Sequence, residues 1–196
     1  MKVRSLLLIP LLLAPVALPA QSAAARANAQ AQMKTPKARI DAAMQAAARA
    51  KVPASLLESK VAEGEAKRVP PDRIAAAVEA RLGALVRASE TMKNADIESA
   101  SAAELAVAAD ALQAGVTESA LIKVSRSASP ERRVVAVAVL ADLVRLGQGS
   151  EPALARVNAA LISSTALANL QAEVASQLRL GGLSSTLDAA GILRLK

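Results

Sequence analysis

Apolar residues recur along most of the chain at the three-residue and four-residue intervals of an amphipathic α-helix. The clearest stripe lies in residues 71–92, where the apolar positions share one narrow sector of a helix that turns about 100° per residue. These positions are Ile74, Val78, Leu82 and Leu85. The stripe predicts a long helix whose apolar face belongs to the core, and shorter stripes on either side predict further helices.

Residues that start and stop helices divide this pattern into eight predicted helices. They cover approximately residues 36–50, 53–66, 71–92, 101–114, 117–127, 130–146, 150–162 and 164–180. Gly181 and Gly182 are expected to end the last helix, because glycine is favoured at helix C-termini.

Capping residues mark several of the predicted helix starts. Ser101 and Glu104 have the spacing of a capping box, in which each side chain bonds the backbone of the other residue. Thr117, Ser150 and Ser164 are expected to cap the helices that begin beside them.

One segment has the composition of a strand. Residues 134–140 form an unbroken apolar run rich in β-branched side chains, which favour strands. No second segment offers a strand to pair with it, and the apolar pattern continues through Leu143, Val144 and Leu146. We therefore interpret the run as a buried central helix.

Composition supports an all-α fold. Of the 196 residues 49 are alanine, the residue with the highest helix propensity, and the chain contains no Phe, Trp, Tyr, His or Cys. The core must then be built from Leu, Val, Ile, Met and Ala. We predict a compact or mildly superhelical bundle of about seven to eight short helices, arranged as stacked helical hairpins.

A short internal repeat agrees with stacked hairpins. Lys51, Val52 and Pro53 align with Arg68, Val69 and Pro70 at an offset of 17 residues. The surrounding block, residues 51–74, reads K-V-P-x-x-L-L-x-x-K-x-x-E-G-x-A-K-x-V-P-x-x-R-I and resembles a segment of uncharacterised exported bacterial all-helical proteins. In those proteins a glycine often precedes Val-Pro, where this chain has lysine and arginine. The resemblance implies an exported helical protein and carries no known activity.

The N-terminus has the layout of a signal peptide. Lys2 and Arg4 precede an apolar run over residues 6–20, which is shorter than the roughly 20 residues of a membrane span. We predict cleavage after Ala20, with cuts after Ala24 or Ala25 and an uncleaved membrane anchor as alternatives.

The composition of the remaining chain indicates three further segments. Residues 21–35 read as a flexible basic linker rich in Ala and Gln, 36–182 as a single helical domain and 183–196 as a C-terminal tail. The net charge of +7 is concentrated near the N-terminus, since residues 21–51 hold six basic residues and one acid. From residue 52 onward basic and acidic residues are equal in number. A neutral domain without aromatic side chains argues against nucleic-acid binding.

The chain lacks the residue types that carry the chemistry of most active sites. Without His and Cys there is no usual general base and no thiolate, and no Ser is followed three residues later by Lys. We predict no enzyme activity, no cofactor and no metal site. Glu58, Glu63 and Glu65 form the one local acidic cluster, and we interpret it as a solvated helix face neutralised by the nearby lysines and arginine.

Arg81 falls inside the apolar stripe of residues 71–92, and a buried guanidinium needs a partner. On one interpretation its stem packs on the core and its head reaches water. On the other, Arg81 binds a carboxylate or phosphate of a partner, together with Lys67, Arg68 and Arg73 at the neighbouring turn. These four residues are the candidate partner-binding residues.

These observations predict an exported, non-enzymatic helical interaction or scaffold protein of the bacterial cell envelope, periplasmic or secreted, with a protein partner. The alternative is a peripheral membrane-surface protein, held by the basic N-terminal segment and the first helix. The sequence does not determine the oligomeric state.

Overall fold

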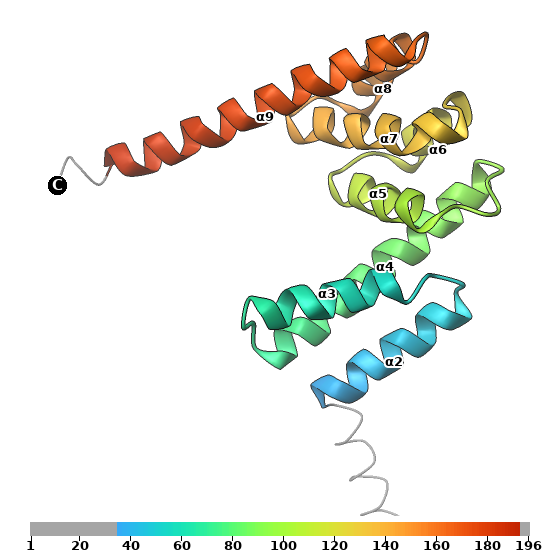
Figure 1. Ribbon diagram of the computed structural model, residues 1–196, viewed down its shortest axis with the longest axis vertical. Helices are drawn as coiled ribbons and strands as arrows, with labels where there is room; N and C mark the ends of the chain where they lie inside the picture. The colour runs from blue at the N-terminus through green and yellow to red at the C-terminus, as the bar shows by residue number, and fades with distance from the viewer. Residues whose placement is uncertain (1–34, 193–196) are drawn as a thin grey trace, which may run out of the picture. The chain divides into compact units, whose positions relative to one another are not determined.

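A computed structural model describes the backbone of residues 35–192 and the side chains of residues 35–180. Within this part the chain forms eight α-helices and no strand (Figure 1). They are α2 (Pro36–Arg49), α3 (Ser55–Ala66), α4 (Pro71–Asn94), α5 (Ala102–Gln113), α6 (Glu118–Ser127), α7 (Pro130–Arg145), α8 (Ser150–Ala160) and α9 (Ser164–Ile192). The predicted signal peptide, almost all of the predicted linker and the last four residues lie outside the described residues.

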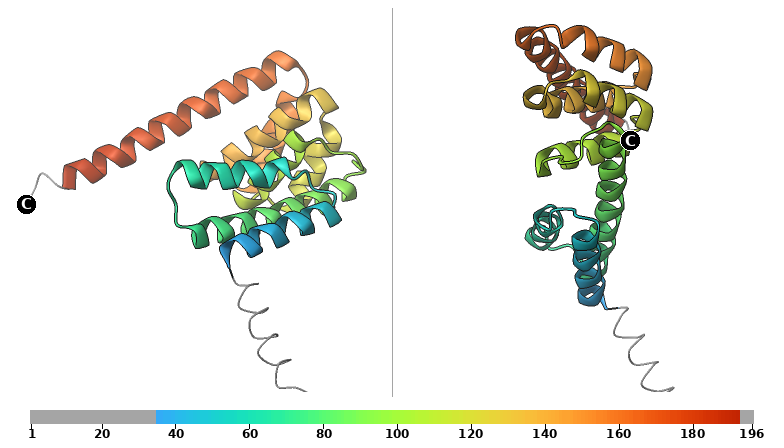
Figure 2. Two further views of the ribbon diagram at one scale, coloured as in Figure 1. Left: turned by 60° about the horizontal axis from the view of Figure 1, so that its bottom comes forward. Right: turned by 90° about the vertical axis from the view of Figure 1, so that its right-hand side faces the viewer.

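The helices stack in two rows, which confirms the predicted all-α fold. In one row α2 packs on α4, α4 on α6 and α6 on α8, and in the other α5 packs on α7 and α7 on α9. Successive helices join the rows, because α3 packs on α4, α5 on α6 and α7 on α8 (Figure 2). Helix α3 belongs to the second row, beside α5, and this position creates the groove described below.

Helix α7 lies at the centre of the C-terminal half. It contacts α5, α6, α8 and α9, and its Val137, Leu140 and Leu143 are at most 1% exposed. The apolar run over residues 134–140 is therefore a buried helix, as predicted. Burial on several sides explains why this run carries no amphipathic period.

Of the predicted caps, those at Ser101 and Thr117 are confirmed, and those at Ser150 and Ser164 are wrong. Ser101 and Glu104 form a full capping box at α5, and Thr117 Oγ1 accepts a bond from Ala120 N at 3.2 Å. Ser150 does not cap α8, because its Oγ accepts from Thr117 N and donates to Gly115 O in a turn 33–35 residues away.

The cap of α9 is Ser163, whose Oγ accepts from Ala166 N at 3.0 Å. We expected this role for Ser164, one residue later. Either serine satisfies the local preference for a hydroxyl, so the sequence alone does not distinguish between the two.

The predicted end of the last helix is also wrong. Helix α9 continues through Gly181 and Gly182 to Ile192 and runs past the end of α7 (Figure 1). Glycine weakens a helix interior by about 1 kcal/mol but does not break it. The two glycines therefore do not act as a stop.

The repeated Val-Pro turns share one backbone geometry. Lys51 and Arg68 each follow a helix with a left-handed backbone, at φ 57° and 53°. In both turns the next residue, Val52 or Val69, donates its N–H back to a carbonyl five residues earlier, as in a Schellman motif. Glycine is favoured at this position because it has no β-carbon.

Candidate functional site: the groove between α3 and α5

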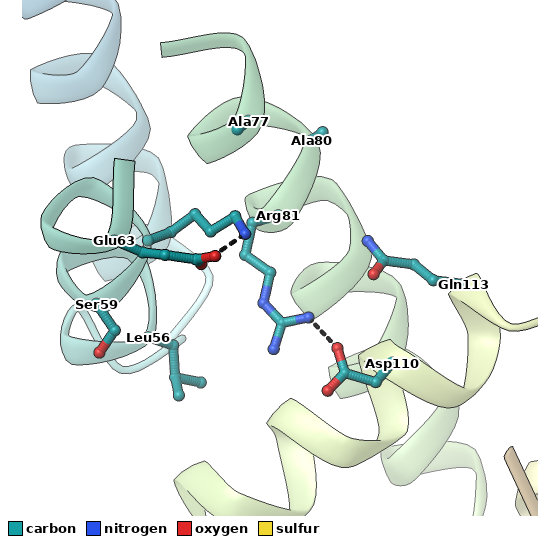
Figure 3. Close-up of a pocket in the computed structure, with 9 residues that line it drawn as sticks. Leu56, Ser59, Glu63, Ala77, Ala80, Arg81, Asp110 and Gln113 are labelled. Carbon is teal, nitrogen blue, oxygen red and sulfur yellow. Dashed lines mark hydrogen bonds and ion pairs between the residues drawn. The ribbon is translucent and has the colours of Figure 1, made fainter. Parts of the chain in front are cut away.

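Helices α3 and α5 both pack against α4, and an open groove of about 500 Å³ lies between them (Figure 3). Helix α4 forms the floor, and the other two helices form the walls. The groove is lined by Leu56, Ser59, Lys60 and Glu63 from α3, Ala77, Ala80 and Arg81 from α4, and Asp110 and Gln113 from α5. We call this surface the α3–α5 groove.

Arg81 lies on the floor of the α3–α5 groove and points toward α5 (Figure 3). Its Nη1 donates to Asp110 Oδ1 at 2.5 Å, and its Nη2 lies 3.5 Å from Ala106 O. The Arg81 side chain is only 17% exposed, whereas Asp110 is 47% exposed. The buried guanidinium thus finds its carboxylate within this chain, while its outer edge remains at the groove surface.

A smaller hollow of about 250 Å³ extends the groove along α3 and α4, and we include it in the α3–α5 groove. Lys60, Glu63 and Ala77 line both spaces, and the smaller one adds Lys67 and Arg73. Its apolar wall is made of Val69 and Ile74. The structure therefore brings Arg81, Lys67 and Arg73 to one continuous surface, as three of the four candidate residues.

Arg68, the fourth candidate, lines neither hollow. It is exposed in the turn between α3 and α4, with the left-handed backbone described above. Its position in that turn does not bring it to the groove.

Glu63 holds two cations of the groove wall. Its carboxylate accepts from Lys60 Nζ at 2.8 Å and from Lys67 Nζ at 2.5 Å. These two hydrogen bonds and the positive charges of the lysines lower the pKa of Glu63 to about 2. The carboxylate is therefore ionised at physiological pH and pairs with both lysines at the rim of the groove.

The groove carries a positive surplus. Four cations line the two hollows, namely Lys60, Lys67, Arg73 and Arg81, against the carboxylates Glu63 and Asp110. Both carboxylates are already engaged by cations. Among the side chains that the structure describes, none pairs with Arg73, and Arg73 is exposed. The site can therefore receive a negative charge without displacing an internal ion pair.

The groove combines charged and polar groups with small apolar side chains. It offers cations, one amide at Gln113, one hydroxyl at Ser59 and a floor of small apolar side chains. Across the described residues no group of three Asp or Glu side chains is close enough to share a metal ion. The cluster of Glu58, Glu63 and Glu65 thus does not converge, and Glu63 is occupied by the two lysines.

Another hollow, of about 660 Å³, lies where α2 and α4 end. Arg49, Lys51 and Lys93 line it together with Asp96 and Glu98. Basic side chains are common at helix C-termini because they face the negative end of the helix dipole. Among the residues that line this hollow Ala50 is the one apolar residue, whereas the α3–α5 groove is lined by Leu56, Ala77 and Ala80.

The geometry defines the class of the molecule, an all-α protein of stacked helical hairpins with an open, positively charged groove. Comparison of the chain with protein-family models, curated proteins and solved structures finds no match. In the described part of the chain, no helix has both the length and the apolar character needed to cross a bilayer.

Sequence reasoning missed Lys60 and Asp110 as groove residues. The spacing of Lys60, Glu63 and Lys67 on one helix face did carry a local signal, since residues three and four apart are neighbours. Asp110 lies 29 residues from Arg81 and reaches it only through the packing of α5 on α4. No pattern in the sequence relates those two residues.

Proposed function

We propose that this chain is an exported, non-enzymatic interaction module of the bacterial cell envelope that binds a protein partner in the α3–α5 groove. The observation that carries the proposal is the groove itself, an open space between two helices that is lined by four cations and two carboxylates beside small apolar side chains. Grooves between helices commonly receive a segment of another polypeptide. Export is supported by the N-terminal sequence pattern alone.

The membrane-surface alternative has less support. It requires the apolar side of the first helix to face lipid. In α2, however, Ala43 and Ala47 are buried, and Ile40 and Met44 pack partly buried against the core. This helix uses its apolar residues within the fold, through its packing on α4.

Site-specific photocrosslinking in the native host tests the proposal. A photoreactive amino acid replaces Ser59 or Gln113 at the groove, or Ser119 on α6 as a matched exposed control. We expect one envelope protein to crosslink from Ser59 and Gln113 and not from Ser119. Equal crosslinking from all three positions, or none from the groove, would contradict a partner in the groove. Fractionation of the same cells tests export.

A further inference from the structure

We propose that the occupant of the α3–α5 groove is an acidic amphipathic helix of the partner, with one carboxylate bound at Arg73 and another at the outer edge of Arg81. This inference rests on the proposed function and names the chemistry of the partner. The argument uses the charge of the groove, the Asp110 contact and the spacing of the two arginines.

The charge of the surrounding helices favours an acidic occupant. Residues 36–95, which form α2, α3 and α4, contain eleven basic and seven acidic residues, whereas residues 96–180 contain seven and nine. The positive excess thus lies on the side of the stack that carries Arg73 and Lys67. Complementary charge guides a partner to its site and fixes its orientation.

Asp110 shows how a carboxylate is held on the groove floor. It bonds Arg81 Nη1, while Arg81 Nη2 makes only the 3.5 Å approach to Ala106 O. A guanidinium has five N–H donors, so one carboxylate on one nitrogen leaves capacity for a second acceptor. The half-exposed Asp110 occupies part of the site that a partner carboxylate would use.

The spacing of the arginines sets the spacing on the partner. Arg73 and Arg81 are eight residues apart on α4, which corresponds to about 12 Å along the helix axis. Carboxylates seven residues apart on a second helix are separated by about 10.5 Å and lie on one face. Between the arginines the floor consists of Ala77 and Ala80, whose short side chains let another helix approach closely.

A synthetic peptide tests this assignment with the full chain. The probe is a capped 18-residue helical peptide with Glu at positions 5 and 12, Leu and Ala between them on the same face, and one Trp near its end. Because the protein has no aromatic residue, tryptophan fluorescence reports the peptide alone. We expect saturable binding of this peptide, and at least tenfold weaker binding when both Glu are replaced by Gln.

Two arginines of α4 provide a matched pair of variants. Arg73 lines the groove, whereas Arg87 is exposed on the same helix and lines none of the hollows described above. We expect Arg73→Gln to weaken peptide binding about tenfold and Arg87→Gln to change it less than twofold, since a charge-assisted hydrogen bond typically contributes about one order of magnitude. Equal effects of the two substitutions would show binding by general charge and overturn the proposal.

The substitution Asp110→Asn should strengthen peptide binding, whereas Arg73→Gln should weaken it. It removes the internal competitor from Arg81, so we expect the peptide to bind several-fold more tightly. An unchanged or weaker affinity overturns the role of Arg81, provided that the circular dichroism spectrum shows a folded variant. Absence of saturable binding up to millimolar peptide also overturns the proposal, as does full displacement of the peptide by vesicles of phosphatidylglycerol.

Different results would contradict the interaction module and the acidic helix as its occupant. If a partner crosslinks at Ser59 and its capture is unaffected by Arg73→Gln, the acidic helix is wrong and the interaction module stands. If nothing crosslinks at the groove, the interaction module is wrong.

Discussion

Gly64 of α3 faces Ile74 of α4 so closely that a β-carbon built on Gly64 would lie 2.7 Å from Ile74 Cγ1. Real β-carbons essentially never come this close to another heavy atom. Ile74 is 6% exposed, so its side chain cannot move into solvent. The glycine therefore sets the distance between α3 and α4 beside the groove.

A pair of glycine substitutions tests this contact. Gly64→Ala should lower the free energy of unfolding by about 1–3 kcal/mol, because it overfills a packed contact. Gly83→Ala should raise it by about 0.5–1 kcal/mol, because a β-carbon there meets nothing within 4 Å and alanine favours a helix interior. Urea unfolding followed by circular dichroism measures both values. Equal signs for the two substitutions would contradict the packing described here.

The left-handed residues after α2 and α3 give a second prediction. Lys51→Gly should raise the free energy of unfolding by about 1 kcal/mol, because glycine removes the steric cost of a positive φ. Gly147→Ala is the reciprocal control. Gly147 has φ 90° with open space around it, so its substitution should destabilise by a similar amount through backbone strain alone. A stability loss in Lys51→Gly, measured by urea unfolding, would mean that Lys51 contributes through its side chain.

The ion pair between Arg133 and Glu104 should be a major determinant of stability. Arg133 Nη1 donates to Glu104 Oε1 at 2.6 Å, and the two side chains are 13% and 10% exposed. Arg133 also donates to Ser125 O, so it joins α5, α6 and α7. Arg133→Met should cost about 3 kcal/mol, because it leaves a buried carboxylate without its cation. The double variant with Glu104→Gln should recover part of this loss in the same unfolding assay.

Glu104 also predicts how stability depends on pH. Burial raises its pKa, but hydrogen bonds from Ser101 and from Arg133, with the arginine charge, outweigh this effect and hold the pKa below its usual range. A carboxyl whose pKa is lowered by folding stabilises the protein above its unfolded-state pKa and loses this contribution as the pH falls through the folded-state pKa. Unfolding free energies measured from about pH 5 downward should therefore fall less steeply in Glu104→Gln than in the unmodified chain.

The exposed control for this pH dependence is Glu58→Gln, because Glu58 is exposed on α3. Its curve should follow that of the unmodified chain. If Glu104→Gln and the unmodified chain have the same acid dependence, the ion pair does not lower the pKa of Glu104.

Another prediction concerns the pKa of the Glu63 carboxyl group. Its pKa should be about 2, measured from the carboxyl carbon shift by NMR. Lys60→Met and Lys67→Met should each raise it, because each removes a hydrogen bond and a positive charge from the carboxylate. Lys123→Met, which removes a lysine paired with Glu151 elsewhere, should leave it unchanged.

Local signals in the sequence predicted the helices well. The capping box at Ser101 and Glu104 acts within a few residues, so its effect can be read directly from the chain. The particular serine that caps a helix was less predictable. Ser163 rather than Ser164 caps α9, and Ser150 serves another turn, because packing decides which hydroxyl meets which N–H.

The groove was only partly predictable. The unusual position of Arg81 in an apolar stripe identified it as a residue in need of a partner. The partner itself, Asp110, depends on how α5 lies across α4. Lys67 and Arg73, on either side of the turn that precedes α4, line the smaller hollow, whereas Arg68, in the same turn, lines neither hollow.

The length of α4 affects the width of the α3–α5 groove. Its 24 residues extend over about 36 Å, with α3 attached near its beginning and α5 attached from Arg81 onward. Because the two walls of the groove are carried by different stretches of one helix, the curvature of α4 sets the distance between them. Gly83 lies two residues after Arg81, at the start of the stretch that carries α5, and is exposed with open space beside it. A bend in α4 between the two stretches would therefore change the width of the α3–α5 groove.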